Sequence, residues 1–196
     1  RDLSMVLDNV KMASFFAEAC REAGASYVLN VSSDAIYADL KVPLSETSGI
    51  CPVSAHGIMH SVREKILEQR LDLPLGNIRP TLIFGLSDPH NGYGPNSFLR
   101  LAKNSKTIKI FGNGEEKRDH IHIDDVAYIA VKMIEENYEG PINAATGNLT
   151  SFFELAELIS SKFKGIKIQK LARKGPMPHN GYRAFDIFNL RRLLGD

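Results

Sequence analysis

The feature that most constrains the fold is an alternation of short apolar segments with an amphipathic segment between them. Residues 27–31 are an apolar run of strand length, residues 75–82 are expected to form a second buried strand, and residues 54–69 carry apolar side chains at helical spacing. A strand, a helix and a second strand joined in this way form a right-handed parallel unit. A further helix is expected over residues 4–22, closed by Gly24. The sequence therefore predicts an α/β protein with a buried parallel sheet.

The second half of the chain predicts further short helices and strands, with one well-marked helix start. Ser151 followed by Glu154 forms a capping box, in which each side chain satisfies a backbone amide at the start of a helix. The other expected elements are a helix at 96–103, a strand at 108–111, a helix capped by Asp124 and Asp125 and running to 137, a strand at 142–144 and a terminal helix at 186–194. No strand is followed by the glycine fingerprint G-x-G-x-x-G of dinucleotide-binding folds.

Charge and composition exclude several classes of partner. The 24 basic and 23 acidic residues give a formal net charge of +1, and no basic block stands out, so neither a nucleic-acid groove nor a membrane surface is expected. Two cysteines do not make a disulfide framework, and no apolar run approaches the roughly 20 residues that span a bilayer. A cytoplasmic protein is expected. Because Arg1 lies so close to the start of a helix, we also expect a preceding segment.

Several blocks of sequence, in order and at matching separations, resemble one enzyme family. The most specific covers residues 111–126, which are close to G-D-G-x-x-x-R-D-F-I-H-V-D-D-V. The others are residues 31–37, which resemble S-S-x-x-V-Y at a strand end, 78–85, which resemble L-R-P-T-N-V-Y-G, 143–147, which resemble N-I-G-S-G, and 183–186, which resemble R-x-x-D. The chain thus resembles the NAD-dependent epimerase/dehydratase branch of the extended short-chain dehydrogenases/reductases.

The resemblance implies the carboxy-terminal part of a Rossmann-like doubly wound parallel sheet, together with a small α/β lobe that binds substrate. Residues 1–85 would be the second half of the NAD(P)-binding domain, whose first half lies upstream. Residues 86–196 would form the substrate lobe, with 119–137 returning to the Rossmann-like domain. The implied activity is that of a nucleotide-sugar oxidoreductase, which epimerises, dehydrates or reduces through a keto-sugar intermediate using NAD or NADP.

The catalytic helix departs from the family pattern at both functional positions. Residues 52–64 keep the frame P-x-S-x-Y-G-x-x-K-x-x-x-E, but His56 replaces the Tyr and His60 replaces the Lys. An imidazole has an unperturbed pKa near 6.5, so it can act as a base at neutral pH without a neighbouring cation. We expect His56 to take the proton of the sugar hydroxyl, and His60, one turn further on, to hold the nicotinamide ribose as a neutral donor.

The resemblance assigns further candidate residues. Ser33 matches the catalytic Ser/Thr, and Asp34 matches the acid of dehydratases, although Ala35 follows where those enzymes have Glu. Arg118 matches the residue that grips the substrate diphosphate. Asn30, Arg79 and Thr81 are expected to contact the cofactor. Leu82, Arg183 and Asp186 are expected to contact the substrate, and for Asp186 the alternative role is to cap a helix.

Two other interpretations of the histidine pair remain open at this point. The domain could have lost hydride chemistry and bind a nucleotide-sugar or a partner, or His56, His60 and Glu64 at i, i+4 and i+8 could meet a metal ion. The family already has Glu at the third position, so no metal site is predicted. Since family members usually dimerise through two helices that include the catalytic one, we expect a homodimer.

Overall fold

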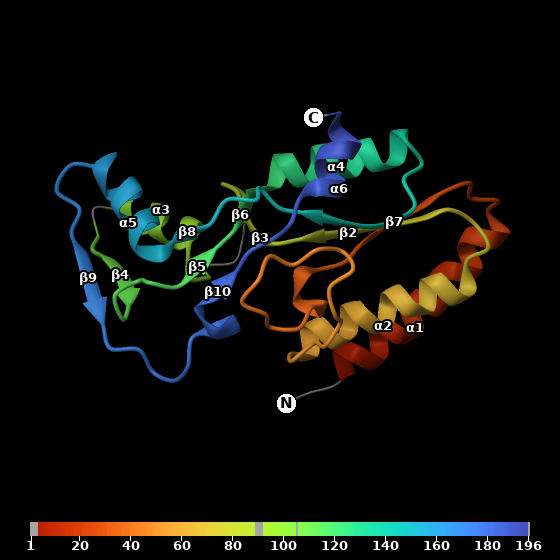
Figure 1. The fold of residues 1–196 in the computed structure, drawn as a ribbon, viewed down its shortest axis with the longest axis horizontal. Helices are drawn as coiled ribbons and strands as arrows, with labels where there is room; N and C mark the ends of the chain where they lie inside the picture. The colour runs from red at the N-terminus through yellow and green to blue at the C-terminus, as the bar shows by residue number, and fades with distance from the viewer. Residues whose placement is uncertain (1–3, 89–91, 105, 196) are drawn as a thin grey trace.

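The chain folds into two lobes placed end to end, as Figure 1 shows. The structure is a computed structural model that describes residues 4–88, 92–104 and 106–195. The larger lobe contains a parallel sheet with helices on both faces, and the smaller lobe is a mixture of short strands and two helices. This confirms the predicted fold class, an α/β protein with parallel pairing.

The larger lobe is built on three parallel strands in the order β1-β2-β7. They are β1 (Val28–Val31), β2 (Leu75–Pro80) and β7 (Gly140–Ala144). In Figure 1, α1 (Ser4–Glu22) and α2 (Ala55–Arg70) cover one face, and α4 (Ile123–Glu135) and α6 (Phe188–Leu194) cover the other. The apolar core lies under α4 and α6, where Ile78, Ile142 and Met133 are fully buried. Because both faces of the sheet are covered, β2 is buried from Gly76 to Pro80, its polar residues Asn77 and Arg79 included.

The smaller lobe is held by a second, aromatic-rich core. Phe98 of α3 (Pro95–Lys103) and Phe152 of α5 (Phe152–Ser161) pack with Ile108 and Ile110 of β4. The strands of this lobe are β4 (Ile108–Phe111) paired with β9 (Ile168–Leu171), and β5 (Lys117–Arg118) between β8 (Thr150–Ser151) and β10 (Tyr182–Arg183). The short turn η2 (Pro178–Gly181) precedes β10, and β3 (Leu82–Phe84) pairs with β6 (His120–His122) where the lobes meet.

The start of α2 is fixed by a close backbone approach. Ser54 caps the helix by accepting a hydrogen bond from the Gly57 amide at 3.0 Å. A Cβ atom on Gly57 would lie 2.2 Å from the Ala35 carbonyl oxygen, in the turn η1 (Asp34–Ile36). Glycine is therefore required if this end of α2 is to lie against the turn that follows β1.

A buried network of polar side chains ties α2 to the sheet. Arg79 of β2 donates from Nη2 to Glu64 Oε2 at 2.6 Å and from Nε to Glu64 Oε1 at 3.0 Å, and both side chains are buried. The same guanidinium donates to the Tyr37 hydroxyl at 2.9 Å. Burial raises the pKa of Tyr37 to about 12, so its hydroxyl keeps its proton and donates to Asn143 of β7 at 2.6 Å. The network thus joins α2, the strands β2 and β7, and the loop that precedes α2.

The secondary structure differs from the expectation in three places. Residues 75–82 were expected as one strand, but two strands are found. The chain leaves its pairing with β7 at Thr81, and the next strand, β3, pairs with β6. The helix after β6 begins at Ile123 and is capped by His122, whose Nδ1 accepts from the Asp124 amide, so that Asp124 and Asp125 lie in its first turn. Strands β5, β8, β9 and β10 were not expected. The helix over residues 4–22 and the Ser151 capping box are confirmed.

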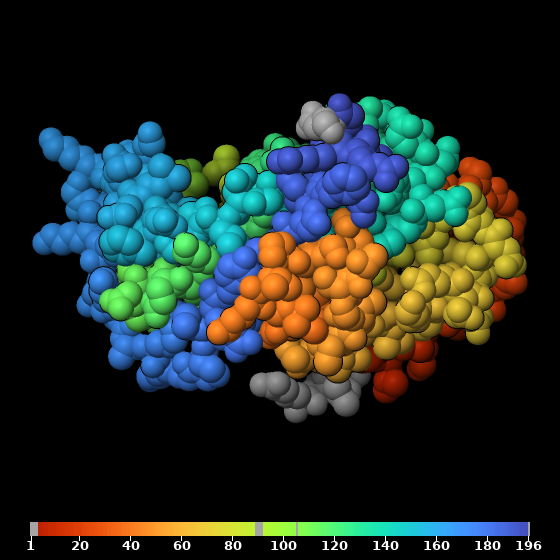
Figure 2. Space-filling view, in the orientation of Figure 1, coloured from red at the N-terminus to blue at the C-terminus, as the bar shows by residue number. Residues whose placement is uncertain are grey.

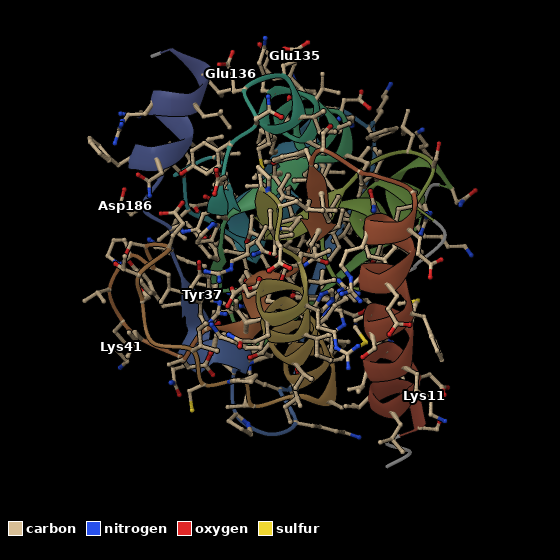
Figure 3. The ribbon with its side chains drawn as sticks, turned by 90° about the vertical axis from the view of Figure 1, so that its right-hand side faces the viewer. Lys11, Tyr37, Lys41, Glu135, Glu136 and Asp186 are labelled. Atoms are coloured by element: carbon tan, nitrogen blue, oxygen red, sulfur yellow. The ribbon has the colours of Figure 1, made fainter. Side chains whose placement is uncertain are left out.

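The chain also crosses between the lobes more often than the sequence suggests. Besides residues 119–137, β7 and α6 lie with the larger lobe. In the space-filling view, the loop after η1 and the segment around β10 adjoin where the lobes meet (Figure 2). Seen from the side, α1 forms one outer edge of the molecule, with Lys11 pointing away from it (Figure 3). Among the described residues, no helix combines the length and apolar character that crossing a bilayer requires.

We predict that Arg79→Met lowers the free energy of unfolding by about 3–5 kcal/mol, because it leaves the buried Glu64 carboxylate without its partner. Urea denaturation monitored by circular dichroism measures this change. Lys65→Met is the matched control, since Lys65 pairs with Glu68 on the surface, where such pairs contribute about 0–1 kcal/mol. A loss in Arg79→Met no larger than in the control would contradict the assignment.

Stability is also expected to depend on pH through His120. Burial, followed by the charge of Arg118, lowers the pKa of His120 to about 4, and its Nε2 is buried with no partner among the described residues. The folded state binds a proton at His120 more weakly than the unfolded state does. The stability that neutral His120 contributes is therefore complete above pH 6.5 and is lost as pH falls towards 4. In His120→Phe, the fall in Tm between pH 6.5 and 4 should be smaller than in the unsubstituted protein; an identical fall would refute this role.

Candidate active site

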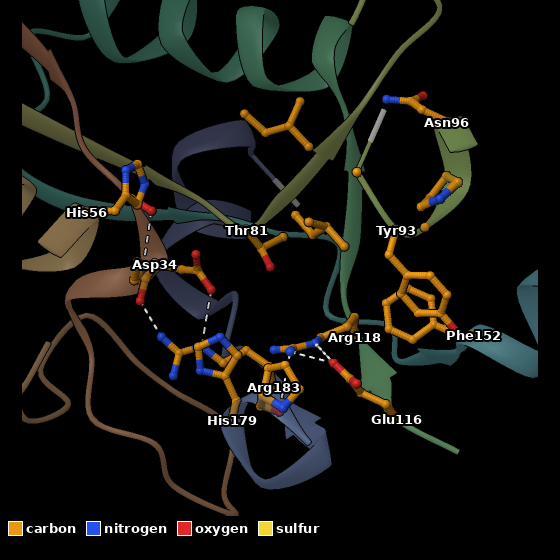
Figure 4. A pocket seen from close by; sticks show the side chains of 18 of the residues that line it. Asp34, His56, Thr81, Tyr93, Asn96, Glu116, Arg118, Phe152, His179 and Arg183 are labelled. Carbon is orange, nitrogen blue, oxygen red and sulfur yellow. Dashed lines mark hydrogen bonds and ion pairs between the residues drawn. The ribbon is translucent and has the colours of Figure 1, made fainter. Parts of the chain in front are cut away.

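A cleft of about 1410 Å³ lies between the two lobes, at the carboxyl ends of β1 and β2. In parallel α/β sheets, ligands bind beyond this edge. Residues Val31–Ala35, His56, His60 and residues 80–83 line it from the larger lobe. The smaller lobe contributes aromatic side chains at Tyr93, Phe111 and Phe152 and charged side chains at Glu116, Arg118, Arg173, Lys174 and Arg183. Figure 4 shows the two groups facing each other across the cleft.

The histidine pair lies at the start of α2 and reaches the cleft. The rings of His56 and His60 have their centroids 4.4 Å apart in an edge-to-face arrangement. His56 is exposed to the cleft, whereas His60 is only 7% exposed. Burial, followed by the neighbouring charges of Arg63 and His56, lowers the pKa of His60 to about 4. His60 is therefore neutral at physiological pH.

Ser33 and Asp34 lie beside the histidines because η1 follows β1 directly. The Ser33 hydroxyl caps this turn, accepting a hydrogen bond from the Ala35 amide at 3.2 Å. The Asp34 carboxylate accepts from Arg183 Nε at 3.1 Å, and Arg183 also binds Asp39 at 2.9 Å. His179 completes the group, with Nδ1 2.5 Å from the same Asp39 oxygen. The carboxylate of Asp34 is thus held in an ion pair between the lobes.

Arg118 faces the cleft with its charge already partnered. Its Nε and Nη2 donate to a single oxygen of Glu116 at 2.9 and 2.5 Å, and Arg173 approaches the other oxygen of that carboxylate at 3.4 Å. Two arginines therefore share one buried carboxylate, which leaves a net positive charge at this end of the cleft. An arrangement of this kind suits a phosphate or carboxylate group, for which arginine offers planar, multiple donors.

Next to the arginines, three aromatic rings line the cleft. The Tyr93 and Phe152 ring centroids lie 4.4 Å apart, and Tyr93 and Phe111 lie 5.1 Å apart. The Tyr93 hydroxyl accepts a hydrogen bond from the Phe111 amide at 3.1 Å, which fixes the tyrosine against β4. Phe111 is exposed and Tyr93 is half-buried, so their rings are accessible to a planar group such as a nucleobase, whereas Phe152 is buried behind them.

Several residues expected at the site line the cleft and others do not. Ser33, Asp34, His56, His60, Thr81, Leu82, Arg118 and Arg183 all line it. Asn30 does not, since its side chain donates to Asn77 within the sheet at 2.8 Å. Arg79 does not either, because its guanidinium is occupied by Glu64 and Tyr37. Asp186 does not line it, and its carboxylate accepts from the Phe188 amide at 2.8 Å, although the N-cap position of α6 is Ile187.

Some residues of the cleft were not foreseen. Glu116 lies two positions before Arg118, and alternate residues of an extended segment share a face, so the spacing itself was a usable signal. Arg173 and His179 come from segments far along the chain, and no local pattern marks them. Tyr93 belongs to the loop before α3, and residues 89–91 of that loop lie outside the described residues.

The metal interpretation finds no support in the geometry. Both oxygens of Glu64 bind Arg79, so this carboxylate does not face the histidines. Within residues 4–88, 92–104 and 106–195, no group of three or more His, Cys, Asp or Glu side chains is arranged to hold an ion.

Comparison with known proteins agrees with the fold. The family model described as "NAD dependent epimerase/dehydratase family" matches residues 1–145. The chain is 31% identical over 152 residues to a UDP-glucose 4-epimerase of Mycolicibacterium smegmatis, covering 74% of this chain and 49% of the relative. It is 30% identical over 131 residues to an ADP-L-glycero-D-manno-heptose-6-epimerase of Brachyspira hyodysenteriae, covering 64% and 41%. The chain thus spans about half the length of these curated relatives.

Solved structures give the same result. A UDP-N-acetylglucosamine 4-epimerase from Methanobrevibacter ruminantium, solved with UDP-N-acetylmuramic acid, superposes with a TM-score of 0.84 at 25% identity, over 94% of this chain and 62% of that protein. The hexosamine 5,6-dehydratase TunA, at 20% identity, has the same fold over 100% of this chain and 66% of its own, with a TM-score of 0.83. With a family model matching residues 1–145 and the fold shared almost throughout, this chain belongs to the NAD-dependent epimerase/dehydratase family.

Proposed function

We propose that the protein is an NAD-dependent nucleotide-sugar oxidoreductase of the epimerase type, acting through a keto-sugar intermediate with His56 as its acid/base. The observation that carries this proposal is the two-sided cleft. On one side His56 and Ser33 can reach a sugar hydroxyl, and on the other Arg118 and Arg173 can reach a diphosphate. A cleft of about 1410 Å³ accommodates both a substrate and part of a cofactor.

The proposed substrate is a nucleoside diphosphate sugar. The arginines that share Glu116 suit the diphosphate, and the adjacent rings of Tyr93, Phe111 and Phe152 suit the base. Relatives and structural neighbours include UDP-glucose 4-epimerases, and one neighbour was solved with UDP-glucuronic acid and NAD. Uridine diphosphate sugars are therefore the first substrates to test.

Residues of the larger lobe fit the nicotinamide half of NAD. His60 and Thr81 line the cleft there, and the buried Ser32 hydroxyl, which also lines it, has no partner among the described residues. These residues would hold the ribose and ring at the carboxyl end of the sheet. When bound, NAD would accept a hydride from the sugar carbon that carries the reacting hydroxyl.

The side chains of this chain divide the proton chemistry between them. His56 takes the proton from the sugar hydroxyl as the keto-sugar forms, and returns it when the carbonyl is reduced. The Ser33 hydroxyl donates to the same oxygen. Asp34, expected as a dehydratase acid, is engaged by Arg183 instead, and Ala35 follows it in place of Glu. Epimerisation is therefore proposed in preference to dehydration.

We predict that His56→Ala lowers kcat by 10²- to 10⁴-fold, the usual contribution of a general base. The assay follows the interconversion of UDP-sugars by the purified protein with NAD. Lys65→Ala, at a solvent-exposed position of the same helix, is the control and should keep its rate. An active protein whose rate does not change in His56→Ala would exclude this base.

The assay also tests the alternative in which hydride chemistry has been lost. A protein that binds UDP-sugars but neither reduces NAD nor interconverts them, while the double variant His56→Tyr/His60→Lys does both, would be an altered family member that binds without reaction. Failure of both forms to bind any nucleotide-sugar would reject the proposal as a whole.

We also propose that the protein is a homodimer that associates through α1 and α2. Along α1 the side chains of Leu7 and Phe15 are 61% and 67% exposed, and Met5, Met12 and Phe16 are exposed beside them. On α2, Ile58 is also exposed. A row of apolar side chains on one outer helix is typical of surfaces that are covered in an assembly.

The double variant Leu7→Glu/Phe15→Glu is expected to convert the dimer to a monomer, because it places charges in an apolar interface. Light scattering coupled to size-exclusion chromatography measures the mass. Val131→Glu, on the exposed side of α4, is the matched control and should leave the mass of the dimer unchanged. A monomeric unsubstituted protein would refute the proposed assembly.

A further inference from the structure

Arg63 lies one turn beyond His60 on α2, between this helix, the end of β1 and α1. Its Nη2 donates to the Val31 carbonyl oxygen at the end of β1, and its Nη1 lies 3.4 Å from Asn9 Oδ1 of α1. These contacts fix the guanidinium from two elements outside its own helix. The same Nη2 lies 2.8 Å from Nδ1 of His60.

The contact with His60 determines where the imidazole carries its proton. A guanidinium has only donors and keeps its charge in proteins, so the Nδ1 that faces it must accept. A neutral imidazole with an accepting Nδ1 carries its hydrogen on Nε2. Doubly protonated His60 would instead place an N–H against the N–H of Arg63, which is repulsive. The contact therefore selects one tautomer and disfavours the cation.

We propose that Arg63 is a positioning residue that holds His60 as the neutral Nε2–H tautomer and itself supplies the fixed positive charge next to the histidine pair. His60 alone replaces the side chain of the family's lysine but not its charge. In this protein the two roles are divided, since His60 presents a donor to the cleft and Arg63 carries the cation one turn away.

Burial supports this division of roles. His60 is 7% exposed, and burial together with the charge of Arg63 lowers its pKa to about 4. The charged group that faces His60 from α2 is Arg63, with the His56 ring on its other side. No carboxylate hydrogen-bonds to His60 among the described residues, so nothing there offsets the preference for the neutral ring. For the proposed function, this means that His60 can donate a hydrogen bond to a cofactor ribose but cannot supply a positive charge there.

Nitrogen-15 NMR of the histidine rings tests the tautomer without any ligand. In the unsubstituted protein at pH 7, His60 should show an unprotonated Nδ1 and a protonated Nε2, and it should remain neutral down to about pH 5, above its pKa of about 4. Because this readout needs no turnover, it is independent of the proposed reaction. A His60 that carries its proton on Nδ1, or that is already cationic near pH 6.5, would overturn the proposal.

Two variants separate the hydrogen bond from the charge. Arg63→Gln keeps an N–H donor, so His60 should retain the Nε2–H tautomer while its titration moves to higher pH. Arg63→Met removes both, so the two tautomers should mix and NAD binding, measured by calorimetry, should weaken about tenfold, as expected for one lost hydrogen bond. Unfolding by urea checks that both variants are folded.

The NAD measurement rests on the proposed function, and the tautomer measurement does not. If the unsubstituted protein binds no NAD while the NMR result holds, the proposed function fails and the role of Arg63 in the site stands. If Arg63→Met leaves the His60 tautomer unchanged in a folded protein, the role of Arg63 is refuted whatever the protein binds.

Discussion

The buried ion pair between Glu64 and Arg79 is the interaction on which the geometry of the cleft depends. It fastens the middle of α2 to β2, two turns beyond His56, while Gly57 allows the start of the helix to lie directly against the turn after β1. Together these contacts leave α2 little freedom to rotate or slide. The two histidines therefore face the cleft. Gly57, Glu64 and Arg79, which fix the helix in this position, do not line the cleft themselves.

Charge inside the cleft is balanced between the lobes in a second set of contacts. Arg183 of the smaller lobe binds Asp34 and Asp39 in the loop after β1, and Glu116 neutralises part of the charge of Arg118 and Arg173. A diphosphate that enters has to compete with Glu116 for the arginines, or to accept donors that Glu116 leaves free. Since Arg118 directs two of its donors at one Glu116 oxygen, the proposed diphosphate site would depend on the balance of charge at this end of the cleft.

The sequence allowed the elements with strong local signals to be predicted, and it missed those that depend on distant partners. Residues 4–22 form the expected helix because their apolar spacing and Gly24 are local features, and the Ser151 capping box likewise needs only its own helix. The expected strand from residue 75 divides at Thr81 because its two halves pair with different strands, β7 and β6. No local sequence pattern in this segment indicates that change of partner. Arg79 was expected at the cofactor because the family motif surrounds it, yet the approach of Glu64 is a tertiary contact.

The histidine pair illustrates both outcomes. The frame around His56 and His60 predicted that both would lie on one helix face at the site, and both line the cleft. The contribution of Arg63 could not be read from the motif, because its contacts to Val31 and Asn9 exist only once α1, β1 and α2 are packed together. The position of the proposed base was thus accessible from the sequence, whereas the contacts and charges around its neighbour His60 required the fold.

A crystal structure of the protein with a uridine diphosphate sugar and NAD tests the account most directly. We expect the diphosphate to contact Arg118 and the nucleobase to lie against Tyr93 or Phe152. We also expect one sugar hydroxyl to lie within hydrogen-bond distance of both His56 and Ser33. A sugar bound with none of its hydroxyls near His56, or a diphosphate bound away from Arg118, would contradict it.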